Sequence, residues 1–437
     1  MSPSKSSPVL LVAYQCGPDM GSVSQIGWEW FHRLAQRRPV TLITHSRNRA
    51  AIEKGWQGDS QSQIEYIDTE WLAGPLYRSA SRLFPGKEHA IFLLSSLDYY
   101  LFDALALRRA KQLQHQGLQW SVVHVPTPVS SAAGTRLHKL GLPLVRGPLN
   151  CGLGNPQGFD DVLQQESQWL NHGRRLGQWL SAWFEKSSHH QITLTATAAT
   201  RRVLPPRQRS HALLENGIDH GNFSATPVPA RSADQPLKVL FVGRMLAVKG
   251  VNFLLHACAQ LITQHQPLQI TLVGDGGKRS EWMALAEKLG IAAHCNFTGN
   301  LPLAQIPALM QQCHVFCLPS VRESGGAVIL EAMACGRPVI AFNFGGPAEL
   351  VTPETGVLLD AKNGAELIQQ LALTLQDCID RPQHWSAMGE QAAHMLHQPH
   401  ALGFDWEHKI DLAEQIYEQM QQEQVLPSCH NTLSLTT

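Results

Sequence analysis

The alternation of short apolar segments with glycine-bearing turns and amphipathic segments limits this chain to one class of fold. An apolar segment over residues 9–13 is followed by a glycine-bearing loop, residues 17–21, and then by an amphipathic segment with apolar side chains at helical spacing. A second apolar segment covers residues 40–44. Strand, helix and strand in this order predict an α/β domain with a doubly wound parallel sheet.

The same alternation continues along the chain and restarts in its second half. The further apolar segments predicted as strands are residues 122–125, 144–145, 192–197, 213–219, 238–242, 270–273, 296–299, 314–318, 338–342 and 357–359. The glycine-rich stretch 146–154 is predicted to be a loop, because repeated glycine disfavours the interiors of helices and strands.

A stretch rich in Pro, Ala and Ser, residues 226–236, separates the two runs of strands and is predicted to be the linker between domains. We therefore predict two Rossmann-like domains facing across a cleft, residues 1–225 and 226–400. Residues 401–437 are predicted to form a helix that packs back on the N-terminal domain, followed by a disordered tail.

Composition narrows the classes of partner. The 437 residues carry 35 Lys and Arg against 35 Asp and Glu, so the balance of charge argues against a nucleic-acid partner. Nine dispersed cysteines are typical of a reducing compartment, which predicts a cytoplasmic protein. No apolar stretch reaches the length of a membrane-spanning helix. Two interpretations stay open for the basic, amphipathic residues 170–184, namely a helix packed on its own domain or a peripheral contact with the inner face of a membrane.

Two glutamates in the stretch 321–350 are candidates for ligand binding. Glu323 and Glu331 lie eight positions apart, and the glycine pair Gly325 and Gly326 follows the first of them. A helix beginning at this Ser-Gly-Gly turn would present peptide N–H groups that favour an anion. The stretch therefore predicts a site for phosphate and hydroxyl groups at the carboxyl edge of a parallel sheet, with an ordinary turn carrying two solvated glutamates as the alternative.

Two basic residues stand beside another glycine turn. Arg244 and Lys249 flank the loop GRMLAVKG, which follows the first predicted strand of the second domain. Arginine can bind two oxygens of a diphosphate at once, and lysine supplies a compact charge. Surface ion pairs are the alternative for either residue taken alone.

The second half of the sequence resembles glycosyltransferase family 4, whose members have the GT-B fold. The resemblance is carried by GRMLAVKG, LVGDGG, FTGN, ESGGAVILEAMACGRPVI and GGPAEL, and it is strong over residues 211–360. The N-terminal half matches mainly in layout, through the loop with Gly17 and Gly21, the strand that reaches His124, and the run ENGID.

The resemblance implies a retaining hexosyltransferase that moves a sugar from a nucleoside-diphosphate sugar to a hydroxyl acceptor, in polysaccharide or glycoconjugate biosynthesis. By it, Arg244 and Lys249 hold the diphosphate, Glu323 meets the hydroxyls of the donor sugar and Glu331 binds those of the ribose. The peptide N–H groups expected near sugar and phosphate are those of Gly325, Gly326 and Ala327. The family needs no metal ion and no cofactor beyond the donor, because the cations and the helix dipole stabilise the leaving diphosphate.

The sequence departs from the family pattern at two places. The run after the first glutamate is Glu-Ser-Gly-Gly, where relatives often carry a bulky residue between the glycines. His124 is the candidate for a catalytic histidine near the sugar, but Pro126 could stand at the matching position instead, and a hydrogen-bonded strand histidine is the alternative. Gly17 and Gly21 either let their loop approach donor phosphates or acceptor, or form a simple turn.

The sequence does not specify the acceptor: a polysaccharide or other carbohydrate, a lipid-linked sugar and a small molecule all fit. Two other kinds of protein are alternatives to a transferase. One is a protein that binds nucleotide sugars without catalysis, and the other is a GT-B enzyme of different chemistry, such as an epimerase or a phosphorylase. The ordered set of Arg244, Lys249, Glu323 and Glu331 argues against a binding protein and an epimerase, and a phosphorylase would need a pyridoxal cofactor bound to a lysine.

Overall fold

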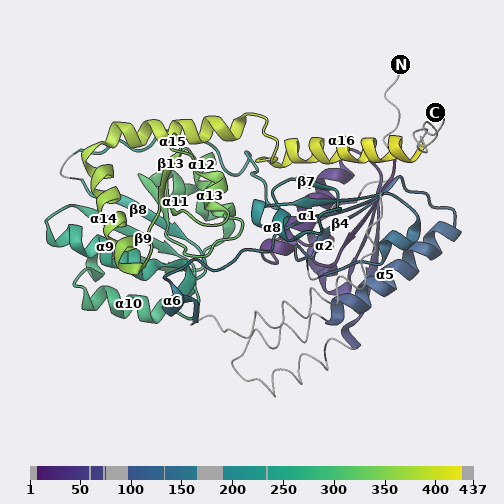
Figure 1. Cartoon of the computed structure of the whole chain (residues 1–437), viewed down its shortest axis with the longest axis horizontal. Helices are drawn as coiled ribbons and strands as arrows, with labels where there is room; N and C mark the ends of the chain where they lie inside the picture. Colours follow the sequence, from purple (N-terminus) through teal and green to yellow (C-terminus); the bar gives the residue numbers. More distant parts are fainter. Residues whose placement is uncertain are drawn as a thin grey trace, which may run out of the picture. The chain divides into compact units, whose positions relative to one another are not determined.

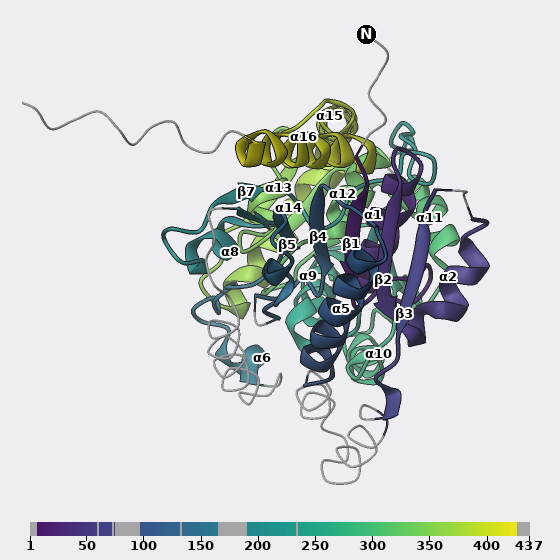
Figure 2. The ribbon, with the colours of Figure 1, turned by 90° about the vertical axis from the view of Figure 1, so that its right-hand side faces the viewer.

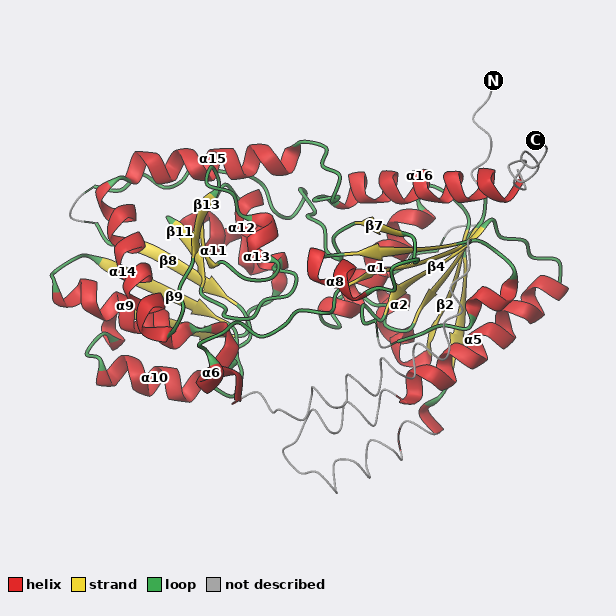
Figure 3. Cartoon of the chain, in the orientation of Figure 1, coloured by secondary structure: helices red, strands yellow, loops and turns green. Residues whose placement is uncertain are grey.

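The computed structural model describes residues 7–58, 61–71, 74, 97–131, 133–164, 190–232 and 235–425. The chain forms two compact units, each with its own parallel sheet flanked by helices (Figures 1 and 3). The first unit comprises Met1–Gly152, Gln168–Glu215 and Glu407–Thr437, and the second comprises Leu153–Ser167 and Asn216–Trp406. The predicted fold class, two Rossmann-like α/β domains, is confirmed.

The first unit contains a seven-stranded parallel sheet in the order β3-β2-β1-β4-β5-β6-β7. Its strands are β1 (Val9–Ala13), β2 (Val40–His45), β3 (Gln63–Ile67), β4 (Val122–Thr127), β5 (Leu144–Leu149), β6 (Gln191–Thr195) and β7 (Ser210–Ala212). Its helices are α1 (Ser22–Ala35), α2 (Arg49–Gly55), α5 (Leu97–His115), α8 (Ala198–Val203) and α16 (Trp406–Val425), with 3₁₀ turns η1 (Ser46–Asn48) and η2 (Leu137–Leu140).

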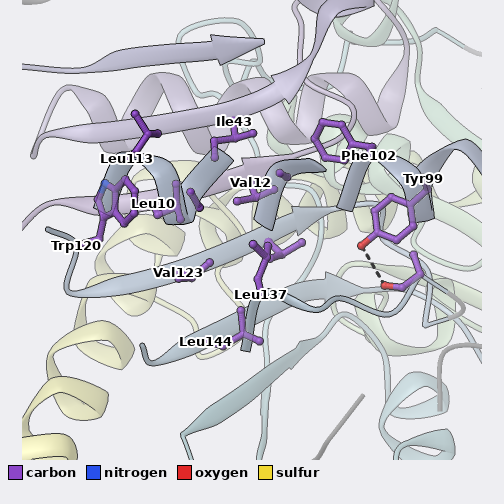
Figure 4. Packing of buried hydrophobic residues seen from close by; sticks show 14 residues of the cluster. Leu10, Val12, Ile43, Tyr99, Phe102, Leu113, Trp120, Val123, Leu137 and Leu144 are labelled. Carbon is purple, nitrogen blue, oxygen red and sulfur yellow. Dashed lines mark hydrogen bonds between the residues drawn. The ribbon is translucent and has the colours of Figure 1, made fainter. Parts of the chain in front are cut away.

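The core of the first unit lies between its sheet and α5, which crosses one face of the strands (Figure 2). Leu10 and Val12 of β1 pack there with Phe102 of α5, and all three are at most 2% exposed. Figure 4 shows this cluster, in which the Tyr99 hydroxyl donates a hydrogen bond to the carbonyl of Ala133. Burying an apolar side chain of this size contributes about 1.5–3 kcal/mol, so the uniformly apolar central strands account for much of the driving force.

Two predicted boundaries in the first unit are wrong. Strand β5 runs on to Leu149, so the predicted loop over 146–154 begins as a strand. Gly147 makes this possible, because its φ is +99° and an added Cβ would lie 2.6 Å from the carbonyl of Leu194. The second error is the strand predicted over residues 213–219. The strand there is the polar β7, which ends at Ala212, and the apolar side chains of Leu213 and Leu214 are buried beyond its end.

The second unit contains a six-stranded parallel sheet in the order β10-β9-β8-β11-β12-β13. Its strands are β8 (Leu237–Val242), β9 (Leu268–Val273), β10 (Cys295–Gly299), β11 (Val315–Leu318), β12 (Val339–Phe342) and β13 (Gly356–Leu359). Its helices are α6 (Asp160–Gln164), α9 (Val251–Thr263), α10 (Arg279–Lys288), α11 (Ile306–Gln312), α12 (Ala327–Ala334), α13 (Pro347–Leu350), α14 (Gly364–Asp380) and α15 (Pro382–His397), with 3₁₀ turns η3 (Ala247–Lys249), η4 (Ala292–His294) and η5 (Leu303–Gln305).

The segment predicted to link the domains is packed on the second unit. The fully buried guanidinium of Arg337 donates to the carbonyls of Thr226 and Pro227, and the Thr226 N–H donates to the carbonyl of Cys335. Near this segment, the chain passes from the first unit to the second between Glu215 and Asn216, whereas the predicted boundary lies between residues 225 and 226. A composition rich in Pro, Ala and Ser indicates that secondary structure is absent, but it does not indicate that packing is absent.

The C-terminal helix α16 packs on the first unit. Arg37 on the loop after α1 forms ion pairs with Glu407 and Asp411, and the fully buried Lys409 donates to the carbonyl of Leu214. The helix predicted over 170–184 and the disordered tail predicted at the end of residues 401–437 lie outside the described residues. Within the described ranges, no helix has both the length and the apolarity needed to cross a bilayer.

Candidate functional site

Three loops of the second unit meet at the carboxyl edge of its sheet, because their backbones are hydrogen-bonded to one another. The loop after β8 is joined to the loop after β9 by the Met245 N–H, which donates to the carbonyl of Asp275 over 2.8 Å. It is joined to the loop after β11 by the Val321 N–H, which donates to the carbonyl of Val248 over 2.9 Å. The glycine turns that the sequence singled out in GRMLAVKG, LVGDGG and ESGG therefore occupy one edge of one sheet.

Two of the predicted site residues form an ion pair. Lys249 ends the turn η3, and its Nζ contacts a carboxylate oxygen of Glu323, which lies in the loop between β11 and α12. Both side chains are only 15% exposed, so the pair is poorly screened by water. Each charge holds the other in place at the sheet edge.

Arg244 differs from Lys249 in its surroundings. It lies just after β8, it is exposed, and among the described residues its guanidinium has no ion-pair or hydrogen-bond partner. A cation that is not already neutralised can accept an anionic ligand without breaking an existing contact. Of the two predicted diphosphate ligands, Arg244 is thus the one that is available in this structure.

Glu331 lies in the second turn of α12, between the buried residues Leu330 and Ala332. Its side chain is partly buried, and no basic side chain pairs with it within the described part of the chain. Burial raises the pKa of Glu331 to about 7, because the charged form loses water without gaining a partner. A carboxylate in this state gains more from hydroxyl donors of a ligand than one already solvated.

The ESGG turn begins α12 and supports a second glycine turn. Gly326 stands before the first residue of α12, Ala327, with φ at +70°, a conformation that favours glycine. Gly346 packs directly on the turn, since an added Cβ there would lie 2.7 Å from the carbonyl oxygens of Ser324 and Gly325. The small residues thus allow the GGPAEL turn to contact the ESGG turn, backbone against backbone.

Gly17 and Gly21 lie in the first unit, in the loop between β1 and α1. Gly21 precedes the first residue of α1 with φ at +103°, and nothing lies within 4 Å of the place where its Cβ would be. Gly17 is more enclosed, because an added Cβ would lie 2.6 Å from the sulfur of Met20. Open space at Gly21 is compatible with the close approach of a ligand, and the role of the loop stays a prediction.

His124 lies in the core of the first unit. Its surroundings differ from those expected of the catalytic residue that the sequence suggested. Its side chain is fully buried, its Nε2 donates to the carbonyl of Gly147 over 2.7 Å, and its Nδ1 accepts from the Tyr417 hydroxyl over 2.6 Å. Burial also lowers the pKa of His124 to about 4, so the ring stays neutral near pH 7. Both nitrogens are occupied, which leaves none to meet a substrate.

Replacing Tyr417 with phenylalanine tests this structural role. The variant leaves the buried Nδ1 of His124 without a donor, and it should lower the free energy of unfolding of the first unit by about 1 kcal/mol. Urea unfolding monitored by tryptophan fluorescence measures the change. Tyr66→Phe is the matched control, because no hydrogen bond of the Tyr66 hydroxyl is found among the described residues. Equal stability of the two variants would contradict the role of the Tyr417–His124 hydrogen bond.

A polar cluster at the carboxyl edge of the first sheet was not predicted from the sequence. Asp98, 1% exposed at the start of α5, accepts hydrogen bonds from the Tyr14 hydroxyl and from the Arg47 guanidinium, each over 2.7 Å. It also accepts from Thr69, which in turn is hydrogen-bonded to the buried His45. Tyr14, Arg47 and Thr69 lie in the loops after β1, β2 and β3, His45 is the last residue of β2, and Asp98 lies in the first turn of α5. Polar residues at and just after the carboxyl ends of successive strands are the sequence signal that could have found the cluster.

No group of His, Cys, Asp or Glu side chains suited to a metal ion occurs among the residues for which the structure gives positions.

Comparison with known proteins gives one family and one fold. The family model of glycosyl transferases group 1 matches residues 225–394, which include Arg244, Lys249, Glu323 and Glu331. The D-inositol 3-phosphate glycosyltransferase of Corynebacterium jeikeium is 31% identical over 244 residues, which is 52% of this chain and 53% of that relative. The chain thus spans about half the length of the curated relatives it matches.

Solved structures match nearly the whole chain. HepE of Anabaena, in complex with UDP-glucose, superposes with a TM-score of 0.62 and 19% identity over 94% of this chain and 99% of that one. Sucrose-phosphate synthase of Thermosynechococcus elongatus gives a TM-score of 0.61 and 19% identity over 95% and 99%. Residues 225–394 therefore match the family model of glycosyl transferases group 1, in a chain that has the GT-B fold.

Proposed function

We propose that this protein is a retaining glycosyltransferase that moves a sugar from a nucleoside-diphosphate sugar to a hydroxyl group of an acceptor. The observation that carries the proposal is the pairing of Lys249 with Glu323 at the sheet edge where the GRMLAVKG and ESGG loops are hydrogen-bonded together. A cation for the diphosphate and a carboxylate for the sugar hydroxyls are thus in contact within one site. Arg244, which has no partner among the described residues, adds a second cation on the same loop as Lys249.

The relatives support a nucleotide-sugar donor. One is by name a glycosyltransferase acting on D-inositol 3-phosphate, and HepE of Anabaena has been solved with UDP-glucose. In this chain the partly buried Glu331 would accept hydrogen bonds from the two ribose hydroxyls, which relieves the cost of burying its charge. Neither the relatives nor the position of Glu331 identifies the base or the sugar of the donor. The test therefore uses a panel of nucleotide sugars.

The proposed reaction does not use His124 as the proton acceptor. The acceptor oxygen forms a bond to the anomeric carbon on the face from which the diphosphate leaves, and the bond from that carbon to the β-phosphate oxygen breaks. The proton of the acceptor hydroxyl passes to an oxygen of the departing phosphate. Arg244 and Lys249 stabilise the charge that develops on the diphosphate, which is the main contribution of such preorganised groups to catalysis.

We place the acceptor at the carboxyl edge of the first sheet, beside the Gly21 turn and the cluster around Asp98. Within that cluster, Arg47 forms an ion pair with the buried Asp98, and 38% of the Arg47 side chain is accessible to solvent. Its guanidinium and the acidic side chains around it can form hydrogen bonds with several hydroxyl groups, as a carbohydrate acceptor or the sugar of a lipid-linked one requires. A lipid-linked acceptor would bring the protein to the inner membrane face from the cytoplasm.

Calorimetric titration of the wild-type protein with UDP-, GDP-, ADP- and dTDP-sugars tests the proposal. One base and one sugar should bind most tightly, and addition of the correct acceptor should release the nucleoside diphosphate. Release measured with free sugars, oligosaccharides and lipid-linked sugars in vesicles then identifies the acceptor class. If none of the nucleotide sugars binds, the proposed function is wrong, and if one binds but no acceptor gives release, the protein is a binding protein.

A further inference from the structure

A segment from the N-terminal half of the sequence is packed on the second unit beside the candidate donor site. Residues 153–164 follow the last residue of the first unit, Gly152, and they include the short helix α6. Composition and spacing gave no reason to separate them from the domain before them. In the structure they belong to the second unit and contact the rest of it at three places.

The first contact is an aromatic anchor. Phe159 is fully buried, with its ring centre 5.1 Å from that of Phe342 at the end of β12 and 6.1 Å from that of Phe253 in α9. Just before it, Gly158 lies so close to the second unit that an added Cβ would be 1.9 Å from the carbonyl oxygen of Lys362. The anchor therefore leaves the segment little freedom to shift.

The second contact is with the residue before Glu323. The guanidinium of Arg322 donates to the carbonyls of Leu153 and Gly154, each over 3.2 Å. The Leu153 side chain also lies 3.0 Å from the place where a Cβ of Gly345 would be. Gly345 precedes Gly346, whose N–H donates to the carbonyl of Glu323 over 3.0 Å. The start of the segment thus supports the Glu323 loop from two sides.

The third contact joins the segment to the other partner of the ion pair. Helix α6 packs against the turn η3, which ends in Lys249. Together the contacts form a closed ring: Lys249 pairs with Glu323, the neighbouring Arg322 donates to Leu153, and the segment that begins at Leu153 returns to the Lys249 turn through α6. One segment therefore holds the loops on both sides of the ion pair.

We propose that residues 153–164 are a part of the nucleotide-sugar site that positions Lys249 and Glu323 for the donor, with Phe159 as its anchor and Arg322 as a positioning residue. The inference rests on the proposed function. Its physical basis is preorganisation, because loops already held in the binding geometry lose less conformational freedom when a nucleoside diphosphate binds. The donor site is then built from two separate stretches of the sequence.

The test compares three variants of the full chain. Phe159→Ala removes the anchor, Phe159→Leu refills most of its space, and Leu375→Ala removes a fully buried side chain of α14 for which the structure gives no contact with the segment. Hydrogen–deuterium exchange of the unliganded proteins reports on residues 247–250 and 319–326. Calorimetry measures the affinity for whichever of UDP, GDP, ADP and dTDP binds the wild type most tightly.

Phe159→Ala should raise exchange in both loops and weaken nucleotide binding about tenfold, whereas Phe159→Leu should restore most of both, and Leu375→Ala should change neither. If Phe159→Ala does not fold, Arg322→Gln takes its place, with faster exchange expected in 319–326. Unchanged exchange in the loops, or an equal loss of affinity in Leu375→Ala, overturns the inference. A wild-type protein that binds none of the four nucleotides contradicts the proposed function instead, and the exchange rates alone then decide whether the segment orders the two loops.

Discussion

Glu331→Gln is expected to abolish measurable binding of nucleoside-diphosphate sugars and, at pH 8, to raise the free energy of unfolding by about 1–3 kcal/mol. The binding loss follows because an amide cannot accept from two ribose hydroxyls as a carboxylate does. The gain in stability follows because the wild-type carboxylate is partly buried without a charged partner. One substitution should therefore move binding and stability in opposite directions.

The pH dependence gives the sign of the stability effect. Burial raises the pKa of Glu331 from 4.5 to about 7, so between these values the folded state binds more protons than the unfolded state. Wild-type stability should therefore fall as the pH rises from 4.5 to 7, and the full cost is present at pH 8. Each unit of pKa corresponds to about 1.4 kcal/mol, and partial access of water reduces the total.

Urea unfolding of wild type and variant at pH 5 and pH 8 measures this effect. The two proteins should be close in stability at pH 5, where Glu331 is protonated, and should differ at pH 8. Glu287→Gln on the exposed face of α10 is the matched control and should change neither stability nor donor binding. Donor binding that survives in Glu331→Gln would show that the ribose assignment is wrong, and a stability difference independent of pH would show that the buried charge is not its cause.

Lys249→Ala and Arg244→Ala should both slow release of the nucleoside diphosphate about 10²–10³-fold, but only Lys249→Ala should also destabilise the second unit. Lys249 neutralises Glu323, which is 15% exposed, so its removal leaves a poorly hydrated carboxylate without a partner. Arg244 is exposed and unpaired among the described residues, so its removal breaks no contact.

Thermal unfolding and a coupled assay for nucleotide release separate these two effects. The double variant Lys249→Ala with Glu323→Ala should be more stable than Lys249→Ala, because no unpaired carboxylate is left at residue 323. It should release the nucleotide no faster than Lys249→Ala, because the cation for the diphosphate is still missing. Lys288→Ala, at the exposed end of α10, controls for the loss of one positive charge. Full activity of Arg244→Ala would show that Arg244 does not bind the diphosphate. Equal stability of Lys249→Ala and Arg244→Ala would contradict the importance of the ion pair in the unliganded protein.

The strands of the second unit were predictable because their local pattern carries enough information. Strands buried on both faces read as continuous apolar runs, as β11 and β12 do. The strands β8, β9, β10, β11, β12 and β13 each begin within about two residues of the predicted segment. The strand β7 was missed because it is short and polar, whereas the buried Leu213 and Leu214 beyond it are apolar without being part of a strand. Periodicity reports burial, and burial alone does not distinguish a strand from a packed loop.

By itself, the sequence determined that the chain has two parallel sheets. It also determined the order of Arg244, Lys249 and Glu323 in the loops of the second unit and of Glu331 in the helix that follows, since both results depend on local pattern and spacing. Only the tertiary structure decided that Lys249 contacts Glu323, and that His124 is occupied by Tyr417, which lies 293 positions away. It also decided that residues 153–164 belong with the second unit. These outcomes depend on contacts between distant parts of the chain. The free energies of such contacts arise only when packing brings the side chains together, so they cannot be inferred from local periodicity.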